Sequence, residues 1–287
     1  MRIGITSPIV TRVPGAHSEW ERAADIEDLG KIAETADRLG FNHLTCSEHV
    51  AVPSDVAEQR GATYWDPLAT FGYLAARTTT LRFATQVLVL GYHHPLEIAK
   101  RYGTLDRVSG GRLILGVGVG SLAEEFALLG AQFAGRGPRA DEALAALRTS
   151  LSQREPAHHG EHYDYEGFVV EPHAVQDRVP LWVGGRTARS LRRATTFGDG
   201  WVPFGLSSDQ LQEMLENAGV REGFEVVLPA GRPLDPSGDP ETTRTRMDGV
   251  RDVGATIVSV QLRARSVEHY CEQLEALAEL NPAGGDR

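Results

Sequence analysis

Two adjacent residues, Glu48 and His49, place a carboxylate next to an imidazole where chemistry is expected. An imidazole titrates near neutral pH, so a positioned histidine can take up or release a proton during a reaction. The pair follows the short strand-like run 42–47, and the helical pattern before that run stops at Gly40. Both side chains therefore leave a strand at its C-terminal end, which is where (β/α)8 barrels hold their catalytic residues.

A first glycine-rich turn contains Gly118 and Gly120 in a G-x-G-x-x-A pattern, so a Rossmann dinucleotide site has to be considered. Such a site normally follows the first strand and is followed, about 20 residues later, by an acidic residue at a strand tip. Here three strand-helix units precede the glycines, and Asp141 falls in a helical pattern. The pattern therefore favours a barrel loop over an NAD site. For Gly116, close packing of a helix on a strand stays open as the alternative.

A second glycine-rich turn, formed by Gly184, Gly185, Arg186 and Thr187, closes one strand and opens a helix near residue 188. Backbone N–H groups at a helix start, together with the helix dipole, attract anions. With Arg186 and Thr187 as further donors, the turn predicts a seat for a phosphate. A plain short connection is the alternative, and the arginines that follow in the helix are open to interpretation as a solvated face.

The segments that position these residues alternate between strand and helix along the whole chain. Strand-like runs cover residues 1–6, 42–47, 81–90, 112–118, 181–184, 200–203, 224–228 and 256–262. Helical patterns lie between them, for example the one that Asp66 and Pro67 open as N-cap and first residue. Eight alternations predict an α/β fold, a single (β/α)8 TIM barrel over residues 1–287. The polar segment 153–178 is predicted to be an inserted hairpin or excursion.

Composition narrows the possible partners. The 287 residues are 41% hydrophobic, enough for a large core, and the net charge of −10 disfavours nucleic acid and anionic membranes. No apolar run is long enough to span a membrane. The two cysteines lie far apart and form no disulfide or zinc pattern, which suits a reducing cytoplasm. A metal site is not expected, because His158, His159, His162 and His173 lack a nearby cysteine or a helical i,i+4 pair.

Together these segments resemble the luciferase-like monooxygenase superfamily, especially its branch that uses the deazaflavin coenzyme F420. The resemblance extends from Met1 to about Leu280, and it rests on the order and spacing of several short motifs. They are Leu39-Gly40-Phe41 leading to Glu48-His49, Pro95 with Ala99-Lys100 and Thr104-Leu105-Asp106, Ser109-Gly110-Gly111-Arg112, Gly116-Val117-Gly118-Val119-Gly120, and Val183-Gly184-Gly185 with Arg193-Ala194 and Gly198-Asp199-Gly200-Trp201.

The resemblance implies that a flavin-like ring lies across the C-terminal mouth of the barrel. His49 would move a proton as hydride passes, and Glu48 would orient or charge-balance its imidazole. A non-proline cis peptide between Gln86 and Val87 would back the ring. An interfacial histidine satisfied by a hydrogen bond is the alternative for His49.

The same resemblance assigns the rest of the cofactor's surroundings to the two glycine-rich turns. Gly118 and Gly120 would let the cofactor approach closely. Its phosphate would be held by Gly184, Gly185, Arg186 and Thr187.

The function implied is an F420-dependent oxidoreductase that exchanges a hydride between the deazaflavin and a small organic substrate. Two alternatives stay open: an FMN-dependent monooxygenase of the same superfamily, and a non-catalytic flavin-binding barrel. His93 and His94, after the third strand, either line the substrate pocket or face solvent. The resemblance also implies a homodimer.

Overall fold

Parallel strands close into a barrel in the computed structural model, which describes residues 1–15 and 17–281. In the described residues the eight staves are β1 (Arg2–Ile5), β3 (His43–Cys46), β5 (Arg82–Thr85), β7 (Leu113–Gly118), β10 (Leu181–Gly184), β11 (Gly200–Val202), β12 (Glu225–Pro229) and β13 (Ile257–Val260). Each pairs with the next, and β13 pairs with β1 to close the ring. The predicted (β/α)8 fold is confirmed. Residues 282–287 of the predicted domain lie outside the described residues.

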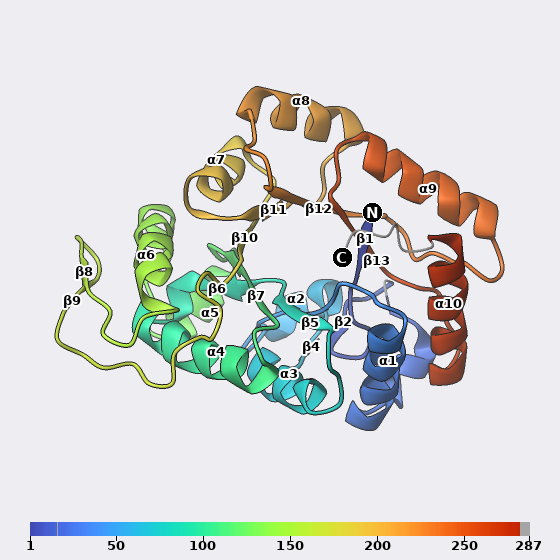
Figure 1. Ribbon diagram of the computed structural model, residues 1–287, viewed down its shortest axis with the longest axis horizontal. Helices are drawn as coiled ribbons and strands as arrows, with labels where there is room; N and C mark the ends of the chain where they lie inside the picture. The colour runs from blue at the N-terminus through green and yellow to red at the C-terminus, as the bar shows by residue number, and fades with distance from the viewer. Residues whose placement is uncertain (16, 282–287) are drawn as a thin grey trace.

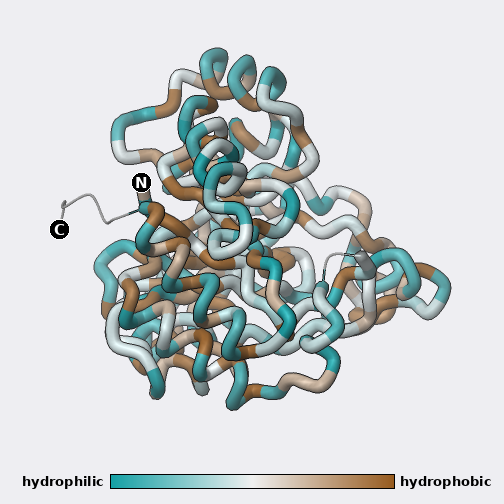
Figure 2. Tube along the Cα trace, turned by 90° about the vertical axis from the view of Figure 1, so that its right-hand side faces the viewer, coloured by the Kyte–Doolittle hydropathy of each residue, from teal (hydrophilic) through white to brown (hydrophobic). Residues whose placement is uncertain are grey.

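Helices surround the strands (Figure 1). They are α1 (Ile26–Arg38), α3 (Pro67–Ala75), α4 (Pro95–Ser109), α6 (Arg136–Ser150), α7 (Ala188–Phe197), α8 (Ser208–Ala218), α9 (Pro240–Asp252) and α10 (Val267–Leu280). Their ends follow the expected chemistry: Asp66 caps α3 by accepting a hydrogen bond from the Ala69 backbone N–H, and Gly40 follows α1 with a positive φ of 77°. Hydrophobic and hydrophilic residues are mixed along the helices (Figure 2), and in α1 the buried Leu29, Ile32, Ala33 and Ala36 follow the helical period, so this helix buries one face.

Shorter elements decorate the barrel. They are β2 (Thr11–Arg12), η1 (Glu19–Arg22), α2 (Ser54–Arg60), β4 (Thr63–Tyr64), β6 (Leu88–Val89), η2 (Leu90–Tyr92) and α5 (Ala123–Leu128). β2 pairs with β4 in antiparallel fashion, which joins the segment after β1 to the segment after β3. Within the predicted excursion 153–178, β8 (His158–His159) and β9 (Asp164–Tyr165) form a hairpin that projects beyond α6 (Figure 1).

The barrel interior contains a buried histidine. His43 on β3 is fully buried, and its ring lies 5.0 Å from that of Trp182 in an edge-on contact. A Cβ atom at position 4 would lie 2.0 Å from the His43 ring, so β1 needs Gly4 at this point. Burial, with smaller effects of Arg82 and Arg2, lowers the pKa of His43 to about 3, and the imidazole stays neutral inside the barrel.

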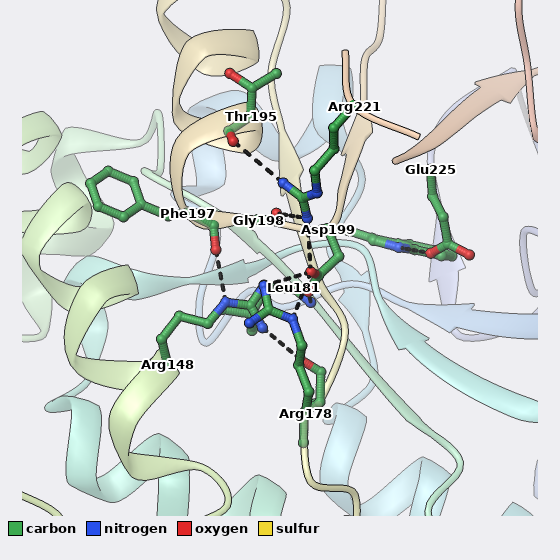
Figure 3. Close-up of polar contacts among 11 residues, drawn as sticks. Arg148, Arg178, Leu181, Thr195, Phe197, Gly198, Asp199, Arg221 and Glu225 are labelled. Atoms are coloured by element: carbon green, nitrogen blue, oxygen red, sulfur yellow. Dashed lines mark hydrogen bonds and ion pairs between the residues drawn. The ribbon is translucent and has the colours of Figure 1, made fainter. Parts of the chain in front are cut away.

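The N-terminal end of the barrel is held by an ion network around Asp199, directly before β11 (Figure 3). Its carboxylate accepts hydrogen bonds from Arg178 at 2.8 Å, from Arg221 at 3.2 Å, from Arg148, and from the Leu181 backbone N–H at 2.9 Å. Burial acts to raise the pKa of Asp199, but the Leu181 N–H and the arginines outweigh burial and lower it. The network therefore stabilises the ionised carboxylate on the floor of the barrel.

Candidate functional site

A cavity of about 520 Å³ occupies the C-terminal mouth of the barrel. Its lining comes from residues that follow β1, β3, β5, β7, β10, β11 and β13. The structure brings together eight of the residues predicted for the site, which all line this cavity: Glu48, His49, Gln86, Val87, Gly118, Gly120, Gly184 and Gly185. Segments far apart in the sequence thus meet where barrels hold their chemistry.

The imidazole of His49 is fixed from one side. Its Nδ1 lies 2.6 Å from the Glu125 carboxylate, and its ring lies 4.5 Å from that of Tyr64. In the described part of the chain Nε2 has no hydrogen-bond partner, and His49 lines the cavity. With Nδ1–H donated to the carboxylate, Nε2 is the nitrogen that can exchange a proton with a bound molecule.

Glu125 on α5 is the carboxylate that the sequence analysis missed. Its side chain is buried, and it also accepts hydrogen bonds from Tyr92 Oη at 2.7 Å and from the backbone N–H groups of Val50 at 2.6 Å and Ala51 at 3.2 Å. Burial acts to raise the pKa of Glu125, but these donors and His49 outweigh burial and lower it. Nothing in the local sequence around Glu125 indicates a partner 76 positions away.

Glu48 does not hold His49, contrary to the prediction. Its carboxylate accepts hydrogen bonds from the Val89 backbone N–H and from His93 Nε2, both at 2.7 Å. The position beside the His49 imidazole is occupied by Glu125, and His93 lies beside Glu48. Burial acts to lower the pKa of His93, but the bond to Glu48 and its charge outweigh burial and raise it. His94 instead caps α4, where its Nδ1 accepts from the Leu96 N–H.

The peptide bond between Gln86 and Val87 is cis, as the family resemblance implies. The Gln86 carbonyl accepts a hydrogen bond of 2.9 Å from Ser47 Oγ. The Val87 side chain fills the space that two glycines leave, because a Cβ atom would lie 2.7 Å from it at Gly118 and 2.8 Å from it at Gly184. These glycines accommodate Val87, and close approach of a cofactor to them stays a prediction.

Gly120 and Gly185 also make room for protein side chains. A Cβ at Gly120 would lie 2.6 Å from the Phe126 ring, and one at Gly185 would lie 2.7 Å from Ser190. Gly120 ends the turn after the fourth stave of a closed barrel. The G-x-G-x-x-A pattern therefore serves a barrel loop in this fold.

A second cavity of about 260 Å³ adjoins the first, and the two share Val119, Gly184 and Gly185. Its lining includes the start of α7 and four arginines: Arg136, Arg186, Arg189 and Arg193. Thr187, the N-cap of α7, accepts a hydrogen bond of 3.2 Å from the Ser190 N–H. A helix start among arginines suits an anion, as the predicted phosphate seat requires.

Two of the four arginines already have protein partners. Arg193 is buried and binds Asp141, so at this position the interpretation as a solvated helix face is wrong. Arg136 donates to the Gly120 carbonyl at 3.0 Å. Arg186 and Arg189 are exposed at the edge of the cavity, where they can meet an incoming anion.

The histidines of the hairpin region have carboxylate partners within the protein. Within ranges 1–15 and 17–281, no group of three or more His, Cys, Asp or Glu side chains could hold a metal ion. His158 instead lies 3.6 Å from Glu142, and His159 binds Asp164 at 2.8 Å. No helix among these residues is both long and apolar enough to cross a membrane.

Comparisons with known proteins agree with this architecture. An uncharacterized protein of Mycobacterium tuberculosis is 28% identical over 274 residues, which cover 85% of this chain and 93% of that protein. The crystal structure of monooxygenase RslO1 from Streptomyces bottropensis aligns with a TM-score of 0.79 and 22% identity, covering 97% of this chain and 98% of that one. An F420-dependent secondary alcohol dehydrogenase in complex with an F420-acetone adduct aligns with a TM-score of 0.77 and 16% identity, covering 99% of both chains.

At these identities the two solved structures show a shared fold. The family is shown by a family model described as luciferase-like monooxygenase, which matches residues 1–256 and so takes in every cavity-lining segment from β1 to β12. A barrel of this type whose strand ends converge on one mouth, and whose sequence matches over that length, belongs to the luciferase-like monooxygenase family.

Proposed function

We propose that this protein is an F420-dependent oxidoreductase that exchanges a hydride between the deazaflavin and a small organic substrate. The observation that carries the proposal is the fixed imidazole of His49, held through Nδ1 by the buried carboxylate of Glu125 with Nε2 free at the cavity. This arrangement suits an acid-base group that works beside a hydride transfer.

The two joined cavities fit a planar ring with an anionic tail. The main cavity is bordered by Val87 and Val89, which offer apolar surface to a ring. The adjoining cavity offers Arg186, Arg189 and the start of α7 to a phosphate. When bound, F420 would supply the hydride chemistry, and the protein would supply position and acid-base help.

The proton is the part of the reaction that the chain's own residues handle. A hydroxyl that is oxidised to a carbonyl has to release its proton, and Nε2 of His49 can accept it. The charge that then develops on the imidazole is balanced by Glu125. Tyr92, Val50 and Ala51 donate hydrogen bonds to Glu125, and the resulting low pKa keeps this carboxylate ionised.

An FMN-dependent monooxygenase is the second candidate, favoured by the likeness of the fold to the monooxygenase from Streptomyces bottropensis. Parallel titrations of the purified protein with F420 and with FMN, followed by fluorescence, separate the two. We expect F420 to bind more tightly. Tight FMN binding with no response to F420 would instead support the monooxygenase.

Replacement of His49 distinguishes an enzyme from a non-catalytic flavin-binding barrel. We expect His49→Ala to lower turnover by roughly 100-fold or more, the usual effect of losing a positioned acid-base group. His159→Ala, on the exposed hairpin, is the matched control and should leave turnover unchanged. Equal turnover of both variants would contradict the role of His49, and a wild-type protein without turnover would favour the non-catalytic barrel. A homodimer stays a prediction that light scattering would test.

A further inference from the structure

Residues after β1 and from α10 form one wall of the main cavity, and this wall holds hydroxyl groups without partners. In the part of the chain that the structure describes, Ser7 Oγ, Thr11 Oγ1 and Tyr270 Oη are buried and have no hydrogen-bond partner. All three residues line the cavity, and the side chains of Ser7 and Tyr270 are more than nine-tenths buried. Buried hydroxyls in folded proteins are normally hydrogen-bonded, so three such groups that line one cavity indicate a ligand.

The part of this wall that follows β1 is joined to the surroundings of His49. The Ser7 backbone N–H donates to Thr45 Oγ1 at 3.3 Å, which joins the ends of β1 and β3. Thr11 pairs with Tyr64 between β2 and β4, and the Tyr64 ring contacts that of His49 at 4.5 Å. A molecule held by these hydroxyls would therefore lie beside the group that exchanges protons.

The two cavities differ in the charge of the residues that line them. The described lining of the main cavity contains no lysine or arginine, whereas four arginines line the adjoining one. The main cavity instead contains the carboxylates of Glu21 and Glu48. Glu21 is held in place by the backbone N–H groups of Ile9 at 2.9 Å and Ser18 at 2.7 Å. An anionic substrate would meet these carboxylates, and no lysine or arginine among the described lining residues would offset them.

Tyr270 can act as a hydrogen-bond donor to a neutral oxygen. Burial, followed by the negative charge of Glu21, raises the pKa of Tyr270, so the phenol keeps its proton at neutral pH. Apolar side chains line the same cavity, including Val10, Val13 and Leu262. The lining thus combines an apolar wall with a few placed polar groups, as specific small-molecule sites do.

We propose that this wall of the main cavity binds the substrate, and that the substrate is a neutral molecule with a hydrocarbon body and a hydroxyl or carbonyl oxygen. Tyr270 and Thr11 hold that oxygen, and Ser7 supplies a further hydroxyl. The assignment of this ligand as the substrate rests on the proposed function. The binding of the ligand to this wall does not depend on that function.

Isothermal titration calorimetry on the full chain tests the proposal with three probes: cyclohexanol, cyclohexanone and cyclohexanecarboxylate. We expect the two neutral probes to bind at least roughly ten-fold more tightly than the carboxylate, because the described lining offers it no lysine or arginine. Tyr270→Phe and Thr11→Val should each weaken cyclohexanol binding about five-fold, the usual effect of losing a neutral hydrogen bond. Tyr163→Phe, outside the cavity, is the matched control and should bind like wild type.

Three results would overturn the proposal: carboxylate binding as tight as cyclohexanol binding, unchanged affinity in both variants, or no binding of either neutral probe by the wild type. Circular dichroism checks that the variants fold. If Tyr270→Phe does not fold, Thr11→Val still tests the proposal. The titrations need no cofactor. A protein that binds cyclohexanol but ignores F420 would therefore refute the proposed function and support this site.

Discussion

The carboxylate of Glu125 connects the chemistry of one residue to the stability of the fold. Burial acts to raise its pKa, but Tyr92, His49 and Val50 outweigh burial and lower it from the ordinary 4.5. A lowered pKa contributes stability that is complete above the ordinary value and is lost as the pH falls through the lowered one. We therefore expect the difference in unfolding free energy between wild type and Glu125→Gln to be largest at neutral pH and to shrink in acid.

Urea unfolding in a series of buffers from neutral to strongly acidic pH measures this difference. Glu124→Gln, the exposed neighbour on α5, is the control and should show little effect at any pH. A difference between wild type and Glu125→Gln that stays constant across the series would contradict the assigned hydrogen bonds.

Among the individual residues, the sequence identified His49 but not its partner. The adjacency of Glu48 and His49 predicted a pair, yet the side chains diverge and bind His93 and Glu125 respectively. Contacts between residues 76 positions apart depend on where α5 lies relative to β3, and no local pattern contains that information. The sequence indicated the glycines of the site but left their role open. A glycine indicates close approach, but the sequence does not tell what approaches.

Among the elements, the start of α7 has two separable roles. Its N-cap Thr187 stabilises the helix, and the resemblance also assigns Thr187 to the phosphate. Thr187→Ala should lower stability by about 1 kcal/mol, as loss of an N-cap usually does. Ser207→Ala removes the corresponding cap of α8, away from both cavities, and should cause a similar loss.

Only Thr187→Ala is then expected to weaken F420 binding, which fluorescence titration of both variants would measure. Equal affinity of the two variants for F420 would show that Thr187 serves the helix alone.

The packing of β5 against β7 depends on one glycine. A Cβ at Gly116 would lie 1.9 Å from the Thr85 carbonyl oxygen, so a side chain at this position requires the backbone to move. We expect Gly116→Ala to destabilise the protein by roughly 3 kcal/mol, at the upper end of the usual effects of overpacking. Gly72→Ala on α3 is the control, because its Cβ has open space and helix propensity favours alanine. Chemical denaturation that ranks the two variants equally would contradict this packing.

Across the whole molecule, the Asp199 network and the two cavities lie at opposite ends of the barrel. Asp199 joins α6, β10 and the segments around β11 on the floor, whereas the cavities open at the mouth. Asp199→Asn removes the charge that three arginines share and should cost about 3 kcal/mol. Affinity for F420 should not change.

Asp248→Asn is the matched control, since its pair with Arg251 is exposed and should matter by less than about 1 kcal/mol. Denaturation and cofactor titration of both variants check the two expectations together. A loss of F420 affinity in Asp199→Asn at a temperature where it is folded would contradict the separation of the two ends.

The fold was far more predictable than the network of the site. Strand and helix patterns along the chain gave all eight staves, because hydrophobic periodicity and capping residues act locally. The unpartnered hydroxyls of Thr11 and Tyr270 had no such signal. These residues line one cavity only after the barrel has closed β13 onto β1, and threonine and tyrosine occur throughout ordinary sequences.

A crystal structure of the protein bound to F420 would show directly whether the deazaflavin ring lies beside His49. We expect the deazaflavin ring in the main cavity with its hydride-carrying carbon facing His49, and the phosphate among Arg186, Thr187 and the start of α7. A ring bound elsewhere, or His49 turned away from it, would contradict the account.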